Sequence, residues 1–227
     1  MSIQRLSTED WQETQNSEYI ELLRKRLSED RLIWVDQFVD LIASNVELKG
    51  GAKLTPLRIN DFGCNVGHFF RGCRDLLKNF DYMGYDISET YLSIARASFG
   101  FHKQLNFEFL DFSLSGSRIA IRPADVSVIS ATLEHVQNYK QALDNVFLTT
   151  RKLVLLRTFI GNEQLLDYCL TKGAKSKYLI RQFTDQDLIG GGQHLWVGMR
   201  SQLWIRPPKV FKNMFVTVTL FLERNLF

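Results

Sequence analysis

The sequence predicts an α/β protein with a doubly wound, seven-stranded and mostly parallel sheet, an antiparallel final strand and an N-terminal helical extension. Two observations predict this class. After residue 56, short apolar runs alternate with amphipathic stretches, which is the pattern of βαβ units with right-handed crossovers. Farther along, the apolar runs 195–205 and 215–222 flank Pro207 and Pro208, so we expect two adjacent antiparallel strands there.

Composition limits the class of protein. The chain has 227 residues, of which 45% are hydrophobic and 23% charged, so it can bury a sizeable core and global disorder is excluded. Its net charge of +3 is too small to argue for a polyanionic partner. Three cysteines without a CxxC pair favour a reducing compartment, and no apolar run approaches a membrane span. We therefore expect a cytoplasmic protein.

The helical extension is expected over residues 1–50. Ser7 can cap a short first helix and Ser17 a second, while apolar residues at helical spacing predict a third over 29–44. Gly50 and Gly51 then break the chain, so residues 51–227 are expected to form the α/β domain.

Within that domain, the alternation predicts strands and helices in turn. The expected strands are 57–62, 82–85, 106–110, 125–130 and 153–156, and the expected helices are 67–78, 88–98 and 139–147. Residues 161–182 read as an insertion, with a helix around 164–170 and a solvated basic turn after it. Thr184 followed by Asp187 resembles a capping box for a short helix.

A glycine-bearing turn between the first strand and the next helix is the most informative segment. It runs Asp61-Phe62-Gly63-Cys64-Asn65-Val66-Gly67-His68. Glycine lets a ligand approach the backbone, and a helix start offers N–H groups. By itself this pattern is equally typical of an ordinary tight turn.

Acidic residues at three successive strand ends favour a ligand site. Asp61, Asp86 and Asp111 are each expected where a parallel strand ends, and these ends share one edge of the sheet. Asp86 also has the offset at which a carboxylate binds a ribose hydroxyl pair. Aspartate is a turn former too, and that alternative is strongest for Asp111.

The spacing of glycines limits the class of ligand that this loop can bind. A dinucleotide fingerprint needs Gly-x-Gly-x-x-Gly, but Asn65 and His68 stand at its second and third glycines, and no Gly-Lys-Ser/Thr of a P-loop is present. A ligand with a ribose, no phosphate and a cationic group near Asp61 fits better.

The segment resembles motif I of the class I S-adenosylmethionine-dependent methyltransferases, Asp/Glu-x-Gly-x-Gly-x-Gly, with Asn65 in place of the middle glycine. The resemblance implies S-adenosyl-L-methionine as the cofactor, ribose binding by Asp86, and adenine contacts from the Asp111-Phe112 pair. Its Leu133-Glu134-His135-Val136 stretch is similar to small-molecule methyltransferases of the quinone-biosynthesis type. The cofactor-binding residues it implies are Asp61, Gly63, Cys64, Asn65, Gly67, Asp86, Ile87, Asp111, Phe112, Ser130 and Ala131.

Glu134 and His135 are the candidate catalytic residues, because they follow the fourth strand. Methyl transfer mainly requires alignment of donor and acceptor, and a base is needed only where the acceptor loses a proton. His135 would suit that role near neutral pH, and Glu134 would contact substrate or act as base. Both could instead stabilise the loop. No histidine stands at metal-ligand spacing, so no metal is expected.

Other residues have two interpretations each. His68 could touch the ligand or pack on the N-terminal segment, and Tyr19 could fold over the cofactor as a lid or belong to the core. Arg71 and Arg74 are expected on a solvated helix face. Arg181 and the lysines before it are expected either to lie in a solvated loop or to attract an anionic substrate.

These observations favour methyl transfer to an oxygen, nitrogen or carbon of a small-molecule acceptor. A nucleic-acid methyltransferase is less expected, since no Asn/Ser-Pro-Pro-Tyr-type tetrad follows the fourth strand. A non-catalytic protein that keeps the fold for binding or assembly is the other alternative, suggested by Asn65. An oxidoreductase on the same sheet is opposed by the missing glycines.

Overall fold

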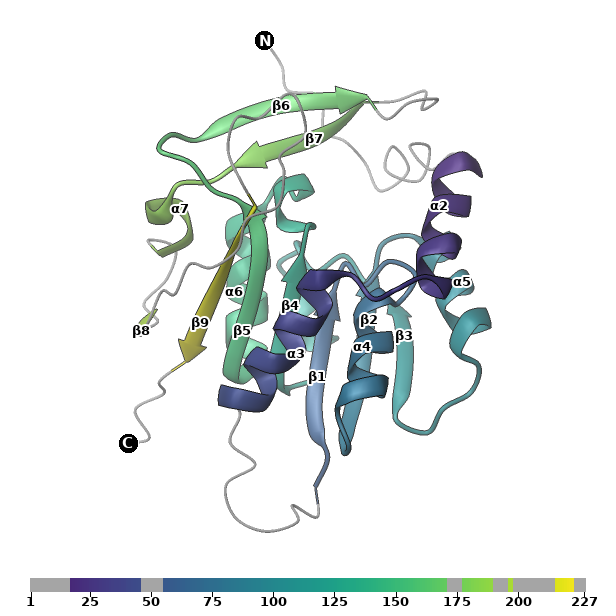
Figure 1. The fold of residues 1–227 in the computed structure, drawn as a ribbon. Helices are drawn as coiled ribbons and strands as arrows, with labels where there is room; N and C mark the ends of the chain where they lie inside the picture. The colour runs from purple at the N-terminus through teal and green to yellow at the C-terminus, as the bar shows by residue number, and fades with distance from the viewer. Residues whose placement is uncertain (1–16, 46–54, 171–176, 190–195, 198–214, 223–227) are drawn as a thin grey trace.

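The computed structural model describes residues 17–45, 55–170, 177–189, 196–197 and 215–222. Figure 1 shows a central sheet with helices on both faces and a separate hairpin above the carboxyl ends of the parallel strands. The expected short helix after Ser7, the lysines at 172 and 175, and most of the expected strand 195–205 lie outside the described residues.

The sheet has the predicted topology. Seven strands lie in the order β3-β2-β1-β4-β5-β9-β8. The first five in this order are mutually parallel, β9 is antiparallel to β5, and β8 is antiparallel to β9. The strands are β1 (Leu57–Phe62), β2 (Phe80–Asp86), β3 (Leu105–Phe109), β4 (Ala124–Ser130), β5 (Thr150–Phe159), β8 (Trp196–Val197) and β9 (Phe215–Leu222). The reversal of strand order at β1 and β4 is the switch point where α/β sheets bind ligands.

Each face of the sheet is covered by its own helices. The helices are α2 (Ser17–Ser28), α3 (Ile33–Asn45), α4 (His68–Leu76), α5 (Glu89–Phe99), α6 (Tyr139–Thr149) and α7 (Asp185–Ile189), with 3₁₀ turns at Ser117–Ile119 and Leu133–His135. One buried core joins the sheet to α3, α4 and α5, and a second joins its other face to α6 and α7. Alternate residues of β1, β2, β4 and β5 enter opposite cores, as the pleat requires.

Local signals in the sequence set several boundaries. Ser88 caps α5, its hydroxyl accepting a hydrogen bond from the amide of Tyr91 at 3.2 Å. Thr184 and Asp187 form the predicted capping box: the amide of Thr184 donates to Asp187 at 2.8 Å, and the amide of Asp187 donates to the Thr184 hydroxyl at 3.2 Å.

The expected helix around residues 164–170 is wrong. Residues Leu165–Leu170 form strand β6, which pairs antiparallel with β7 (Lys177–Gln182) in a two-stranded sheet of its own. A helix this short is marginal in isolation, whereas a partner strand satisfies the backbone N–H and C=O groups that face it. Tyrosine and cysteine in the segment also lower its helix propensity.

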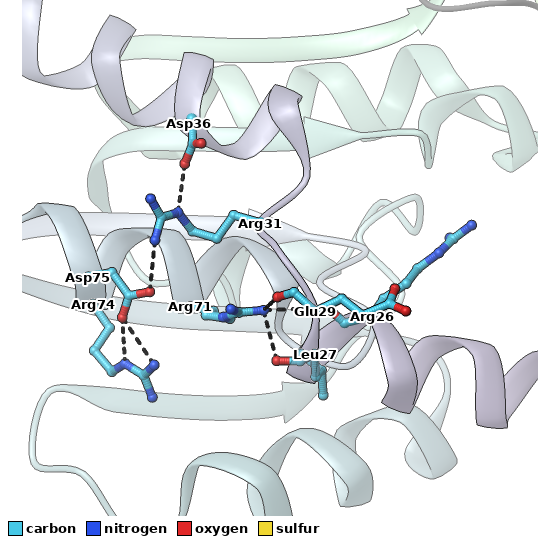
Figure 2. Close-up of polar contacts among 8 residues, drawn as sticks. All are labelled: Arg26, Leu27, Glu29, Arg31, Asp36, Arg71, Arg74 and Asp75. Carbon is cyan, nitrogen blue, oxygen red and sulfur yellow. Dashed lines mark hydrogen bonds and ion pairs between the residues drawn. The ribbon is translucent and has the colours of Figure 1, made fainter.

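The expectation of a solvated face for Arg71 is wrong as well. Its guanidinium donates to the backbone carbonyls of Leu27 at 2.8 Å and Glu29 at 2.6 Å, at the end of α2 (Figure 2). Arg74, one turn farther along α4, is exposed and pairs with Asp75. The sequence shows which residues share a helix face, but it does not show which segment packs on that face.

Candidate cofactor and active site

The loop after β1 follows a sharp path at the carboxyl edge of the sheet. Gly63, Asn65 and Gly67 have φ angles of +73°, +54° and +88°. The amides of Gly63 and Cys64 both donate to the carbonyl of Tyr85 on β2, at 2.8 and 3.0 Å. A Cβ at Gly63 would lie 2.2 Å from the Thr132 hydroxyl oxygen, so only glycine fits against the loop after β4.

Asn65 has a φ of +54°, in the left-handed region that glycine adopts readily. Asparagine tolerates the left-handed region better than other side chains. Its Oδ1 accepts a hydrogen bond from the amide of Val66 at 2.8 Å, so the side chain folds back on its own turn. Asparagine at this position is therefore compatible with a left-handed turn.

Asp86 is the last residue of β2 and ties the loop to that strand. Its Oδ2 accepts from the amide of Asn65 and its Oδ1 from the amide of Ser88, both at 2.9 Å. The residue is 7% exposed. Burial raises the pKa of its carboxyl to about 6, against the lowering effect of the amide hydrogen bonds.

Asp61 lies deeper, on the face of β1 that meets α4. It is 3% exposed, and the hydroxyl of Tyr82 donates to its Oδ2 at 2.5 Å. Burial raises the pKa of Asp61 to about 7, opposed by the Tyr82 hydrogen bond and increased by the charge of Asp86. Two carboxylates with raised pKa values at one strand edge are typical of a functional site.

Asp111 and Phe112 follow β3, which ends at Phe109 rather than at residue 110. The Oδ1 of Asp111 accepts from the amide and the hydroxyl of Ser113, at 2.9 and 2.6 Å, so this carboxylate stabilises the turn. The ring of Phe112 is buried against Phe62, with ring centroids 5.1 Å apart.

Cys64 and Ile87 lie beside the same edge. The thiol of Cys64 is buried, and a Cβ at Gly84 would lie 2.8 Å from its sulfur. The side chain therefore packs into the core, while its backbone forms part of the loop. Burial raises the pKa of this thiol well above its ordinary value. Ile87 follows Asp86 directly and is half-buried.

Ser130 is the last residue of β4, and Ala131 follows it next to the loop. Ala131 has a φ of +53°, a conformation that costs an alanine about 1 kcal/mol or more. Its amide donates to the carbonyl of Arg157 at 2.8 Å, and the Arg157 Nε donates to the Ser130 hydroxyl at 2.8 Å. Strain of this kind gathers at functional sites, where the surroundings hold it in place.

Glu134 and His135 lie in the 3₁₀ turn after β4 but differ in environment. Glu134 is 1% exposed and its Oε2 accepts from the Thr158 hydroxyl at 3.0 Å. His135 is half-buried, and its Nδ1 lies 2.6 Å from the carbonyl oxygen of Leu179 on β7. Because a carbonyl only accepts, Nδ1 carries the proton, and in the neutral ring Nε2 is the basic nitrogen.

The structure adds two arginines to this region. The Arg157 guanidinium lies 5.0 Å from the centroid of the Trp34 ring of α3. Arg181 of β7 is 8% exposed, lies 4.5 Å from the centroid of the Tyr139 ring, and donates to the carbonyl of Val136 at 3.1 Å. The expectation of a solvated Arg181 is therefore wrong, since the hairpin folds onto the loop after β4. The one sequence signal for Arg157 was a charged residue directly after the apolar run 153–156 of β5.

His68 packs on α2. Burial lowers its pKa to about 4, and its ring interacts with the backbone of Leu23. This arrangement matches the expectation of packing on the N-terminal segment.

The residues present fit a nucleoside ligand with a cationic group. A carboxylate at the end of β2, a loop with three left-handed residues and a second buried carboxylate meet at one sheet edge. Among the described residues, no group of three or more His, Cys, Asp or Glu side chains could hold a metal ion. In the same part of the chain, no helix has the length and apolar character needed to cross a membrane.

Comparisons with known proteins agree with this geometry. Residues 60–151 match the family model described as a methyltransferase domain. No curated protein sequence matches the chain.

The fold is similar to that of solved structures. Magnesium protoporphyrin IX methyltransferase from Synechocystis PCC 6803 with bound SAM aligns with a TM-score of 0.61 and 14% identity, over 98% of this chain and 100% of that one. An S-adenosylmethionine-dependent methyltransferase from Clostridium acetobutylicum ATCC 824 aligns with a TM-score of 0.61 and 14% identity, over 90% and 98%. The CurJ carbon methyltransferase aligns with a TM-score of 0.56 and 14% identity, over 84% and 54%.

At these identities the likenesses to solved structures show a shared fold, and the family match identifies the domain within it. Residues 60–151 therefore match a methyltransferase domain, and the chain has the fold of solved S-adenosylmethionine-dependent methyltransferases.

Proposed function

We propose that this protein transfers the methyl group of S-adenosylmethionine to a small-molecule acceptor. The observation that carries the proposal is the bonding of Asp86 to the amide of Asn65, which joins the motif I loop to the end of β2. When bound, the cofactor would supply a methyl group carried on a sulfonium for in-line transfer to an acceptor atom. The protein's main task is then alignment.

The cofactor roles proposed for the residues follow from their positions. Asp86 would accept from ribose hydroxyls, and the backbone of Gly63 to Gly67 would lie along the methionine part. The segment Asp111-Phe112 would meet the adenine, mainly through backbone atoms, because the Asp111 carboxylate holds a turn and the Phe112 ring is buried. Asp61 would favour the positive charge of the cofactor from below the loop.

The acceptor would lie beside the turn after β4. Ser130 and Ala131 precede this turn, Glu134 and His135 lie in it, and the β6–β7 hairpin lies above it (Figure 1). We propose that His135 accepts a proton where the acceptor is a hydroxyl or amine, because Leu179 fixes the tautomer that leaves Nε2 basic. Glu134, buried and bonded to Thr158, would instead hold the turn.

A small metabolite is the proposed class of acceptor. Among proteins of similar fold, one acts on magnesium protoporphyrin IX and another is a carbon methyltransferase. The low net charge of +3 supports a small molecule over nucleic acid. Two buried free thiols, Cys64 and Cys73, suit the cytoplasmic location proposed for the protein.

Two measurements test the proposal. Calorimetry should show binding of S-adenosylmethionine and S-adenosylhomocysteine to the wild-type protein and much weaker binding to Asp86→Ala. A screen of metabolite pools for S-adenosylhomocysteine release then identifies the acceptor. Absence of binding by either nucleoside would contradict the proposal and favour the non-catalytic alternative.

A further inference from the structure

Helix α2 packs directly on the cofactor-binding loop. Leu23 and Val66 are 2% and 0% exposed, and they form a small buried cluster with Tyr91 and Ile94 of α5. Tyr19, Ile20 and Leu27 of α2 pack around this cluster. Val66 belongs to the loop itself, between Asn65 and Gly67, so α2 covers one side of the loop.

Asp86 lies close enough to α2 for its charge to act on the Tyr19 hydroxyl. Burial raises the pKa of the Tyr19 hydroxyl, the nearby charge of Arg26 lowers it, and the charge of Asp86 raises it. Tyr91 likewise has its pKa raised by burial and by the charges of Tyr19 and Asp86. The two phenols therefore lie near Asp86, on the side covered by α2.

The packing of α2 differs from that of its neighbour. Four residues of α3, Val35, Phe38, Val39 and Ile42, enter the main core against the sheet. Helix α2 has one buried residue, Leu23, and its cluster is separate from both main cores. An element with so little buried apolar surface can open without unfolding the rest.

Arg71 fastens the end of α2 to the helix that follows the loop. Its NH1 donates to the carbonyls of Leu27 at 2.8 Å, Glu29 at 2.6 Å and Arg26 at 3.5 Å (Figure 2). The last carbonyls of a helix have no partner within it and carry partial negative charge, so a guanidinium there makes charge-assisted bonds.

The connection from α2 to α3 is anchored separately. Arg31 donates to Asp36 at 2.7 Å and to Asp75 of α4 at 3.2 Å. Arg71 and Asp75 lie four residues apart and so on one face of α4. One holds the end of α2, and the other holds the chain beyond it.

We propose that α2 is a lid over the cofactor-binding loop, that Arg71 is the latch that keeps it closed, and that the lid pivots about the connection held by Arg31. The proposal rests on the proposed function, since the lid gates exchange of S-adenosylmethionine and S-adenosylhomocysteine. Arg71 is a positioning residue, because its bonds join two parts of the protein and do not touch the cofactor.

This geometry has a kinetic signature. A contact that is the same with and without ligand cannot change the equilibrium affinity, because only differential interactions shift a binding equilibrium. Loss of the latch should therefore raise the association and dissociation rate constants together. A residue that merely shapes the site would weaken affinity instead.

The test compares Arg71→Ala with Arg74→Ala, which removes the same charge from the same helix but makes no bond to α2 among the described contacts. Surface plasmon resonance with S-adenosylhomocysteine should show both rate constants of Arg71→Ala raised about tenfold, the effect of losing charge-assisted hydrogen bonds, with Kd within about twofold. Arg74→Ala should match wild type. Arg71→Lys, which keeps the charge but fewer donors, should lie between them and replaces Arg71→Ala if that variant does not fold.

Unchanged rate constants in a folded variant, or a Kd raised through dissociation alone, would overturn the latch. Hydrogen exchange gives a readout that needs no ligand: amides of α2 should exchange about tenfold faster in Arg71→Ala, while those of α3 keep the wild-type rate. If wild type fails to bind S-adenosylhomocysteine but the exchange result holds, the proposed function fails and the hinged helix stands. If the amides of α2 exchange at the same rate in Arg71→Ala as in Arg74→Ala and wild type, the hinged helix is refuted.

Discussion

Replacing Asp61 by asparagine should stabilise the protein at neutral and alkaline pH. Burial raises the pKa of Asp61 to about 7 from its ordinary value of 3.8. At ~1.4 kcal/mol per pKa unit, keeping this carboxylate ionised in the folded state costs about 4 kcal/mol relative to the unfolded chain. Asparagine removes that cost and keeps an oxygen that accepts the Tyr82 hydrogen bond.

The sign of the pH dependence follows from proton binding. Between pH 4 and pH 7 the folded state keeps the Asp61 proton while the unfolded chain has lost it, so the stability of wild type falls as pH rises through this window. The free energy of unfolding of Asp61→Asn should equal that of wild type near pH 4 and exceed it by about 4 kcal/mol at pH 8. Asp86 titrates in both proteins, so the difference reports Asp61 together with its coupling to Asp86.

Urea denaturation at pH 4, 6 and 8 measures these differences. Asp125→Asn is the matched control with the opposite sign. Burial alone would raise the pKa of Asp125, but hydrogen bonds from the Arg58 amide and Lys152 hold it below its ordinary value, so this variant should lose stability above pH 4. A gain for Asp61→Asn that is the same at all three pH values would refute the assignment of a buried, costly carboxylate.

Three further predictions concern the loop and the turn after β4. Asp86→Ala should weaken S-adenosylmethionine binding tenfold or more in calorimetry, since two charge-assisted bonds of ~1.5–3 kcal/mol each are lost; unchanged affinity in a folded variant removes Asp86 from the ribose role. Asn65→Gly should keep wild-type stability, whereas Asn65→Ala should lose about 1 kcal/mol in urea denaturation because alanine disfavours a φ of +54°. Equal stability of the two variants would contradict the left-handed conformation. His135→Ala should bind cofactor normally, but its turnover rate should fall by ~10²–10⁴ if the acceptor gives up a proton. Normal turnover would contradict the role of His135 as a base, and alignment of donor and acceptor would then be the only source of catalysis.

Much of the fold could be predicted because its signals are local. A strand with both faces buried reads as an apolar run, and an amphipathic helix reads at a period of 3.6, so β1 and α5 lie where the sequence placed them. The loop and its acids could be predicted for the same reason: a left-handed turn needs glycine or asparagine wherever it occurs.

The hairpin could not be predicted in this way. Residues 165–170 are strand only because residues 177–182 supply a partner, and the sequence of the first segment does not specify that pairing. The pairing then carries Leu179 to His135 and Arg181 to the turn after β4. A candidate base thus depends on a segment more than 40 residues away for its tautomer.

The sequence by itself determined the class of fold, the left-handed loop and the carboxylates at the strand ends, because these depend on backbone preferences and periodicity within a few residues. Only the tertiary structure decided which charges are buried and what they hold. Arg71, Arg157 and Arg181 are alike in the sequence, yet one latches a helix, one lies over a tryptophan ring and one braces the turn after β4. The physical reason is that a guanidinium makes the same bonds with any carbonyl or ring brought to it, and the packing of distant segments alone decides which carbonyl or ring that is.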